Sequence, residues 1–317
     1  MKKSPTSNLN QTHPPNQPDI FHRIDFEKET HPIKGKVRWS PAKSLWWSSM
    51  AVTWLTLGTI YISPSAVLIF IFLSSVTLCF GHSLGMHRKL IHQAFDCPKW
   101  VEYSLVYLGT LVGLGGPFTM MHTHDIRDWA QRQSNCHPFL SHQNTIGKDF
   151  FWQLHCKLHL HTPPDYHFPK SLKDDRFYRF LQSTSMLQQL PLGIALFAIG
   201  GWGWVAWGIC GRVTISILGH WLIGYYAHNQ GQRDWHLQDV AVQGYNVKHL
   251  GLITFGECWH NNHHAFPGSA QLGMKPGQCD PGWHILCAMQ SIGLARNLQT
   301  PDTLPQRTNL IPIESKK

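Results

Sequence analysis

Charge is scarce in this sequence and is absent from two long stretches. Charged residues make up 14% of the 317 residues, and none lies between Ser44 and His87 or between Phe180 and Gly211. A helix that crosses a membrane needs about 20 consecutive apolar residues. Uncharged stretches of this length exclude an ordinary water-facing surface for these parts of the chain, and they predict membrane spans.

Several sequence signals of other protein classes are also missing. The eight cysteines include no close C-x-x-C pair, so free thiols are expected rather than a zinc knuckle or an iron–sulfur cluster. There is no His-Pro-Gly-Gly haem segment. The net charge of +9 comes from scattered Lys and Arg residues without a basic run between aromatics, so no nucleic acid partner is expected.

The uncharged stretches, together with an apolar run that follows Arg212 and reaches Ala227, give four expected spans that form two hairpins. Pro64 marks a turn between a span at about 45–62 and one at about 66–86, and a short connection that holds Arg212 separates 187–210 from 213–227. Residues 103–121 are interrupted by Gly115–Pro117, so we expect a shallow or re-entrant segment there. The predicted fold is an all-α, multi-pass integral membrane protein with a histidine-rich cap.

Positive residues flank the open ends of the first expected hairpin, which places both ends in the cytoplasm by the positive-inside rule. They are Lys34, Lys36, Arg38, Lys43, Arg88 and Lys89. Residues 1–43 lack the apolar core of a signal peptide and are expected to be a mobile cytoplasmic tail. The main domain is then 44–295 and the C-terminal tail 296–317, with both termini cytoplasmic and, in a bacterium, the inner membrane as the location.

Histidine is unusually common, with 22 residues, and several lie in groups at the expected cytoplasmic ends of the spans. Imidazole is a neutral nitrogen donor that binds iron, zinc and copper. On a helix, His260 and His264 would face the same side, with His263 on their flank. These groups of histidines therefore predict a metal centre. The groups are His82, His87 and His92; His122 and His124; His228; and His260, His263 and His264.

Two segments carry a resemblance to a known family. Gly85–His92 (GMHRKLIH) and Gly256–Pro267 (GECWHNNHHAFP) resemble the first and third histidine boxes of membrane fatty acid desaturases of the acyl-CoA Δ9 type. The resemblance covers about 65–282. It implies two non-haem irons that use dioxygen to remove two hydrogens from an acyl chain, and it implies His228 as a further ligand. It also implies an external electron donor, expected to be a ferredoxin or a cytochrome b5-like protein.

The second histidine box departs from the family pattern. The family's His-Arg-x-His-His falls on residues 124–128 (HDIRD), where only His124 is kept. Arg127 has no lone pair to give to a metal, whereas the carboxylate of Asp128 can bind iron. Three nearby histidines are alternatives for the missing coordination: His122, His137 and His142.

The expected reaction is oxygen-dependent desaturation of a fatty acyl chain, with an acyl-CoA or related thioester as substrate and membrane lipids around the protein. Two rival hypotheses stay open. One is a hydroxylase of the same superfamily acting on an alkane, sterol or lipid, and the other is a non-catalytic lipid-binding scaffold with an incomplete metal site. The expected metal ligands are His87, His92, His124, Asp128, His228, His260, His263 and His264.

Overall fold

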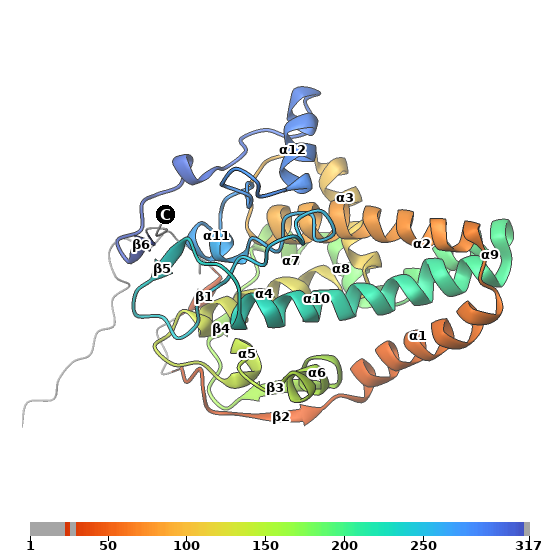
Figure 1. The fold of residues 1–317 in the computed structure, drawn as a ribbon, viewed down its shortest axis with the longest axis horizontal. Coiled ribbons are helices and arrows are strands. Elements are labelled where there is room, and N and C mark those ends of the chain that lie inside the picture. The colour runs from red at the N-terminus through yellow and green to blue at the C-terminus, as the bar shows by residue number, and fades with distance from the viewer. Residues whose placement is uncertain (1–22, 26–29, 314–317) are drawn as a thin grey trace, which may run out of the picture.

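Helices form most of the protein, for which a computed structural model describes residues 23–25 and 30–313. Figure 1 shows long helical arms extending to one side and a cap of short helices, strands and loops at the other. The helices are α1 (Pro41–Ile60), α2 (Pro64–Val76), η1 (Thr77–Ile91), α3 (Lys99–Leu111), α4 (Pro117–Gln131), α5 (Pro138–Ser141), α6 (Ile146–His155), α7 (Lys170–Lys173), α8 (Arg176–Thr184), α9 (Gln189–Val205), η2 (Ala206–Gly211), α10 (Arg212–Asn229), α11 (His260–Ala265), α12 (Pro281–Ser291) and η3 (Pro301–Thr303).

Three short antiparallel strand pairs accompany the helices, which the all-α expectation did not include. They join β1 (Ile24–Asp25) to β4 (Asp165–Tyr166), β2 (Gly35–Trp39) to β3 (Cys156–Leu160), and β5 (Trp235–Leu237) to β6 (Leu310–Pro312). Two helical stretches of the described chain are long and apolar enough to cross a membrane, Pro64–Ile91 and Gln189–Asn229.

The first hairpin turns where its proline predicts. α1 ends at Ile60 and α2 begins at Pro64, whose fixed φ and missing N–H suit the first turn of a helix. Ser63 caps α2, because its hydroxyl oxygen accepts the backbone N–H of Ala66 at 3.2 Å. The predicted turn is confirmed, and α2 then continues directly into the π-helix η1.

The second hairpin turns earlier than we predicted. α9 is broken at Gly201, whose φ of 64° is a backbone conformation that glycine adopts at little cost. The predicted turn at Arg212 is wrong, because this residue is fully buried inside the helical stretch that follows Gly201. Its guanidinium donates to the carbonyl oxygens of Gly208, at 2.8 Å, and of Leu111, so these partners take the place of the water that a charged turn would need.

The turns of the two hairpins lie together at the far end of the arms. Trp204 Nε1 donates to Ser65 Oγ at 3.1 Å, and a Cβ added at Gly203 would lie 2.7 Å from the carbonyl oxygen of Tyr61. Large apolar side chains on the arms face outward, a surface that suits lipid better than water. They include Leu45, Val52, Leu55, Ile60, Leu68, Ile71, Phe72, Ile194 and Ile199.

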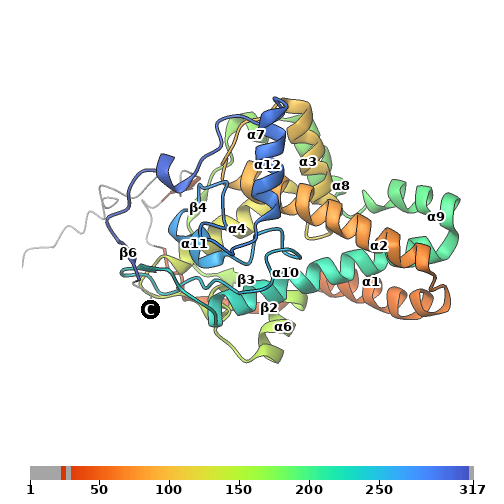
Figure 2. The same cartoon turned by 45° about the horizontal axis from the view of Figure 1, so that its top comes forward.

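α3 and α4 return the chain to the end of η1. They flank the predicted Gly115–Pro117 break, which is confirmed, and the backbone reverses at Gly113 and Gly115 with φ values of 90° and 141°. α3 packs so closely on η1 that a Cβ at Gly85 would lie 2.4 Å from the carbonyl oxygen of Leu105. α12 lies beside α3 and η1 (Figure 2), and the three share a buried apolar core.

Two stretches that composition led us to treat as tails contain structure. β2, before Lys43, pairs with β3 along its whole length. After residue 295, β6 pairs with β5, and Arg307 donates to the carbonyl oxygen of His264 at 2.9 Å. The remaining part of the expected N-terminal tail, residues 1–22 and 26–29, lies outside the described residues.

Candidate metal centre

Seven of the eight predicted ligands lie in two neighbouring groups at the cap end of the helical arms. Within each group, one ligand atom from every residue lies within 4.8 Å of the others. The residues come from η1 and its end, α4, α10 and α11, so the fold joins distant parts of the sequence. Group 1 consists of His87, His92, His124 and His263, and group 2 of His228, His260 and His264.

The π-helix η1 explains how the spacing between His87 and His92 makes a ligand pair. Residues five apart point in different directions on an α-helix, but a π-helix joins residue i to residue i+5 through its backbone hydrogen bonds. Accordingly, the backbone N–H of His92 donates to the carbonyl oxygen of His87 at 3.0 Å. The two ring centroids are then 4.8 Å apart, and the ring of His124 is 4.8 Å from that of His92.

The short helix α11 divides the third box between the two groups. His260 and His264 share one face, with their Nε2 atoms 3.0 Å apart, and Nε2 of His260 is 3.1 Å from that of His228. His263 faces group 1, with its ring centroid 4.6 Å from that of His87. The predicted placement of His260 and His264 on one side is confirmed.

The imidazoles of α11 are suited to a metal in their protonation, and that of His263 also in its lack of hydrogen-bond partners among the described residues. Burial, and next to it the closeness of other imidazoles that cannot all carry a proton, holds the pKa of His260, His263 and His264 well below its usual range, so they are neutral. Among the residues that the structure describes, none forms a hydrogen bond with either buried ring nitrogen of His263. Leaving such a group unpaired costs free energy that metal binding would offset. The residues therefore fit a nitrogen-ligated metal centre.

Comparison with known proteins assigns the family. No family model matches the chain. It is, however, 35% identical to the sn-1 stearoyl-lipid 9-desaturase of Anabaena variabilis over 76% of this chain and 86% of that protein. It is 32% identical to the enzyme of the same name from Synechocystis over 89% of this chain and 88% of the relative. The chain belongs to the membrane fatty acid desaturase family.

Members of this desaturase family differ in carrier and in double-bond position. The icosanoyl-CoA 5-desaturase of Limnanthes douglasii is also 32% identical to this chain, over 94% of it and 85% of the relative. Family membership therefore supports an oxidoreductase that desaturates fatty acyl chains and associates with membranes. The two histidine groups agree with the metal chemistry that the resemblance implied.

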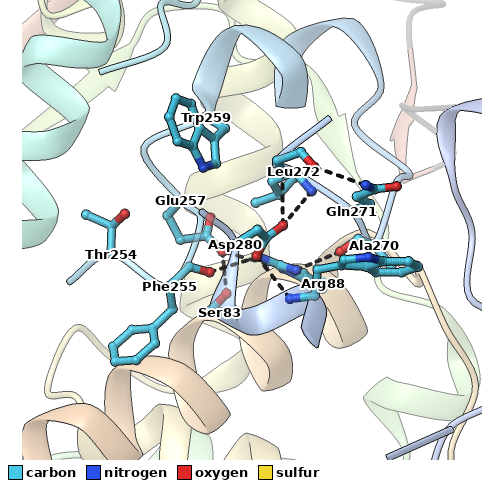
Figure 3. Close-up of polar contacts among 12 residues, drawn as sticks. Ser83, Arg88, Thr254, Phe255, Glu257, Trp259, Ala270, Gln271, Leu272 and Asp280 are labelled. Carbon is cyan, nitrogen blue, oxygen red and sulfur yellow. Dashed lines mark hydrogen bonds and ion pairs between the residues drawn. The ribbon is translucent and has the colours of Figure 1, made fainter. Parts of the chain in front are cut away.

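Glu257 lies behind one predicted ligand of this desaturase from outside the groups. One of its carboxylate oxygens lies 2.7 Å from Nδ1 of His87. The other accepts the Ser83 hydroxyl at 2.6 Å, as Figure 3 shows. Burial acts to raise the pKa of Glu257, but the neighbouring His87 and Arg88 outweigh it and hold the value at about 2. A carboxylate on the Nδ1 side of an imidazole is the usual support that leaves Nε2 free for a metal. The sequence placed Glu257 inside the third box but gave no sign of this role.

We expect Glu257→Gln to weaken iron binding by about 10–100-fold, because an amide orients an imidazole less strongly than a carboxylate does. The measurement is the iron content of the purified protein during titration with a chelator. Asp174→Asn is the control, since Asp174 is exposed and lies on a different segment. Equal iron retention in Glu257→Gln and the wild type would show that Glu257 does not support the ligand.

The two residues of the second box that differ from the family pattern, Arg127 and Asp128, belong to neither histidine group. Arg127 donates to Oε1 of Gln153 at 3.0 Å. The carboxylate of Asp128 lies 3.7 Å from the guanidinium of Arg132, and Asp128 is in neither of the groups found in the described chain. The structure thus brings the seven predicted histidines together without the predicted carboxylate.

The three alternative histidines have different surroundings. His122 is exposed, with its ring 4.9 Å from that of Tyr166. His137 caps α5, since its Nδ1 accepts the backbone N–H of Phe139 at 3.0 Å. His142 is buried, and its ring stacks on that of His228 at a centroid distance of 5.3 Å.

Proposed function

We propose that this protein desaturates saturated fatty acyl chains with dioxygen at a di-iron centre held by the two histidine groups. The observation that carries this proposal is the convergence of seven histidines, from four separate segments, in a chain of the desaturase family. Two bound irons would activate dioxygen and so supply the oxidising power for removing two hydrogens from an unactivated chain.

The protein's own residues bind the metals, orient their ligands and exclude water. Group 1 and group 2 each supply imidazole nitrogens, and Glu257 sets the orientation of His87. The uncharged helix α2 and the helix α10, whose one charged residue is the buried Arg212, form part of the long arms that extend from the cap, which gives an apolar acyl chain a matching environment (Figure 1). The proposed oxidation of the acyl chain would then take place at the end of the apolar region where the histidines lie.

We further propose position 9 as the site of desaturation and a glycerolipid as the acyl carrier. The sequence resemblance led us to expect acyl-CoA at this position. The names of the relatives from Anabaena and Synechocystis support position 9 but specify a stearoyl lipid, whereas the Limnanthes relative acts on a CoA ester at position 5. The lipid carrier is preferred because two of these three relatives share it, one of them at 35% identity against 32% for the Limnanthes relative.

The test is expression in a host without its own aerobic desaturase, together with a working electron donor. A pulse of labelled stearate, followed by mass spectrometry of the lipid and acyl-CoA fractions, should show a product two mass units lighter, with its double bond at position 9, appearing first in glycerolipids. If the unsaturated product appeared first in the acyl-CoA fraction, the proposed glycerolipid carrier would be wrong. A product sixteen mass units heavier than the substrate would favour the hydroxylase. The absence of any product, with folded protein and an active electron donor, would favour the non-catalytic scaffold.

We propose that the histidine groups face the cytoplasm, where a ferredoxin or cytochrome b5-like donor docks on a basic surface. The β2–β3 pair contributes exposed Lys36, Arg38 and Lys157, and Arg38 lies directly opposite Lys157. Like charges kept this close favour an acidic partner. We expect donor binding to weaken strongly between about 0.05 and 0.5 M salt, and replacement of the three residues by glutamine to remove most of that dependence. Salt-insensitive binding would contradict the proposal.

A further inference from the structure

Group 2 has one nitrogen donor fewer than group 1. Within the part of the chain that the structure describes, group 1 contains four histidines, whereas group 2 contains three, His228, His260 and His264. The second box does not make up the difference, because Arg127 cannot ligate a metal and the Asp128 carboxylate lies beside Arg132. A metal held by group 2 would therefore need a further donor from another part of the chain or from solvent.

His142 lies against group 2 from the connection between α5 and α6. Its side chain is buried, with a residue exposure of 1%, and its ring is nearly parallel to that of His228, at an angle of 13° and a centroid distance of 5.3 Å. Its carbonyl oxygen accepts the side-chain amide of Asn229 at 3.0 Å, which ties it to the end of α10. His142 is thus held beside the one ligand that α10 contributes.

The partner of His142 determines which ring nitrogen has a free lone pair. Nδ1 of His142 lies 2.9 Å from a carboxylate oxygen of Asp149, and the same oxygen accepts the Trp221 indole N–H at 2.8 Å. Because an ionised carboxylate only accepts hydrogen bonds, Nδ1 carries the proton and Nε2 keeps the lone pair. Among the described residues, that buried Nε2 has no hydrogen-bond partner.

A carboxylate also lies behind a member of group 1. Nδ1 of His87 lies 2.7 Å from a carboxylate oxygen of Glu257, and Nδ1 of His142 is hydrogen-bonded to one of Asp149. A carboxylate behind an imidazole is the usual support of a metal-bound histidine. His142 shares this support, although no motif that we recognised in the sequence includes it.

A glycine leaves space in front of the free nitrogen. A Cβ added at Gly224, one turn before His228 on α10, would lie 3.4 Å from Nε2 of His142. Any longer side chain at this position would meet the imidazole and compete for the space that a ligand to Nε2 needs. Gly224 therefore keeps the approach to Nε2 open.

We propose that His142 is the fourth nitrogen donor of group 2 and binds the second metal through Nε2. This inference rests on the proposed di-iron function. His142 lies outside the set of atoms within 4.8 Å of one another, so a metal shared with His228, His260 and His264 would draw Nε2 toward them. In this role His142 supplies one of the donors that the second box lacks at Arg127 and Asp128.

The test compares His142→Ala and Asp149→Asn with His122→Ala, a control on an exposed histidine that lies outside both groups. Each full-length protein is purified with ⁵⁷Fe, and its iron content and Mössbauer spectrum are measured. We expect about two irons per chain in the wild type and the control, and about one in His142→Ala. Added imidazole should restore the second iron, and Asp149→Asn should weaken its binding by about 10–100-fold.

Other outcomes separate this inference from the proposed function. Two irons with a wild-type spectrum in His142→Ala would overturn the role of His142 and leave the di-iron proposal in place. A wild type that binds no iron would overturn both. If His142→Ala does not fold, Asp149→Asn provides the test of the role of His142. Unchanged affinity for both irons in Asp149→Asn would also exclude a metal-bound His142.

Discussion

Replacing His263 with alanine is expected to abolish desaturation and to remove a metal from group 1. His263 lies within ligand distance of His87, His92 and His124, and it has no hydrogen-bond partner in the described chain that would give it another purpose. Loss of a residue that only supports a ligand typically costs about 10–100-fold, so loss of a ligand itself should lower product formation by more than about 100-fold. Iron content and fatty acid analysis of the same preparation measure both effects.

The control for this variant is His284→Ala on α12. His284 is exposed and belongs to neither group, so its loss should leave iron content and product at wild-type levels. The two variants remove the same side chain and differ only in its place in the fold. Full activity in His263→Ala would show that group 1 is not the catalytic metal centre.

Arg88→Met is expected to destabilise the fold by about 3–5 kcal/mol, because it leaves the buried carboxylate of Asp280 without its cation. The guanidinium of Arg88 donates to Asp280 at 2.8 Å and to the carbonyl oxygens of Phe255, at 3.0 Å, and Ala270, at 2.6 Å (Figure 3). Both Arg88 and Asp280 are 1% exposed, so water cannot replace these bonds. Methionine keeps much of the apolar length but supplies no donor.

A thermal unfolding series in detergent measures this effect. We expect the Tm of Arg88→Met to fall by about 6–20 °C, whereas Arg179→Met should change it little because Arg179 is exposed on α8. The double variant Arg88→Met/Asp280→Leu should recover part of the loss, because it removes the unpaired charge. An unchanged Tm in Arg88→Met would show that the network of Figure 3 does not hold η1 to the third box.

The positions of helix ends were predictable from the sequence wherever a residue with a fixed backbone preference marked them. Pro64 and the Gly115–Pro117 break interrupt helices as expected, because proline lacks an N–H and glycine accepts unusual φ values. The prediction failed at Arg212, because charge was taken as a sign of solvent. Carbonyl oxygens of the folded protein solvate that guanidinium instead, and the turn lies at Gly201.

The sequence by itself determined which residues can ligate a metal, and that the long uncharged stretches require an apolar environment. These are properties of side-chain chemistry and of local spacing, which need no knowledge of distant contacts. The tertiary structure alone decided how the seven histidines divide into two groups, and that Asp128 lies beside Arg132. It also decided that Asp149 stands behind His142. Contacts between distant segments depend on how helices pack, and hydrophobic patterns allow many such packings.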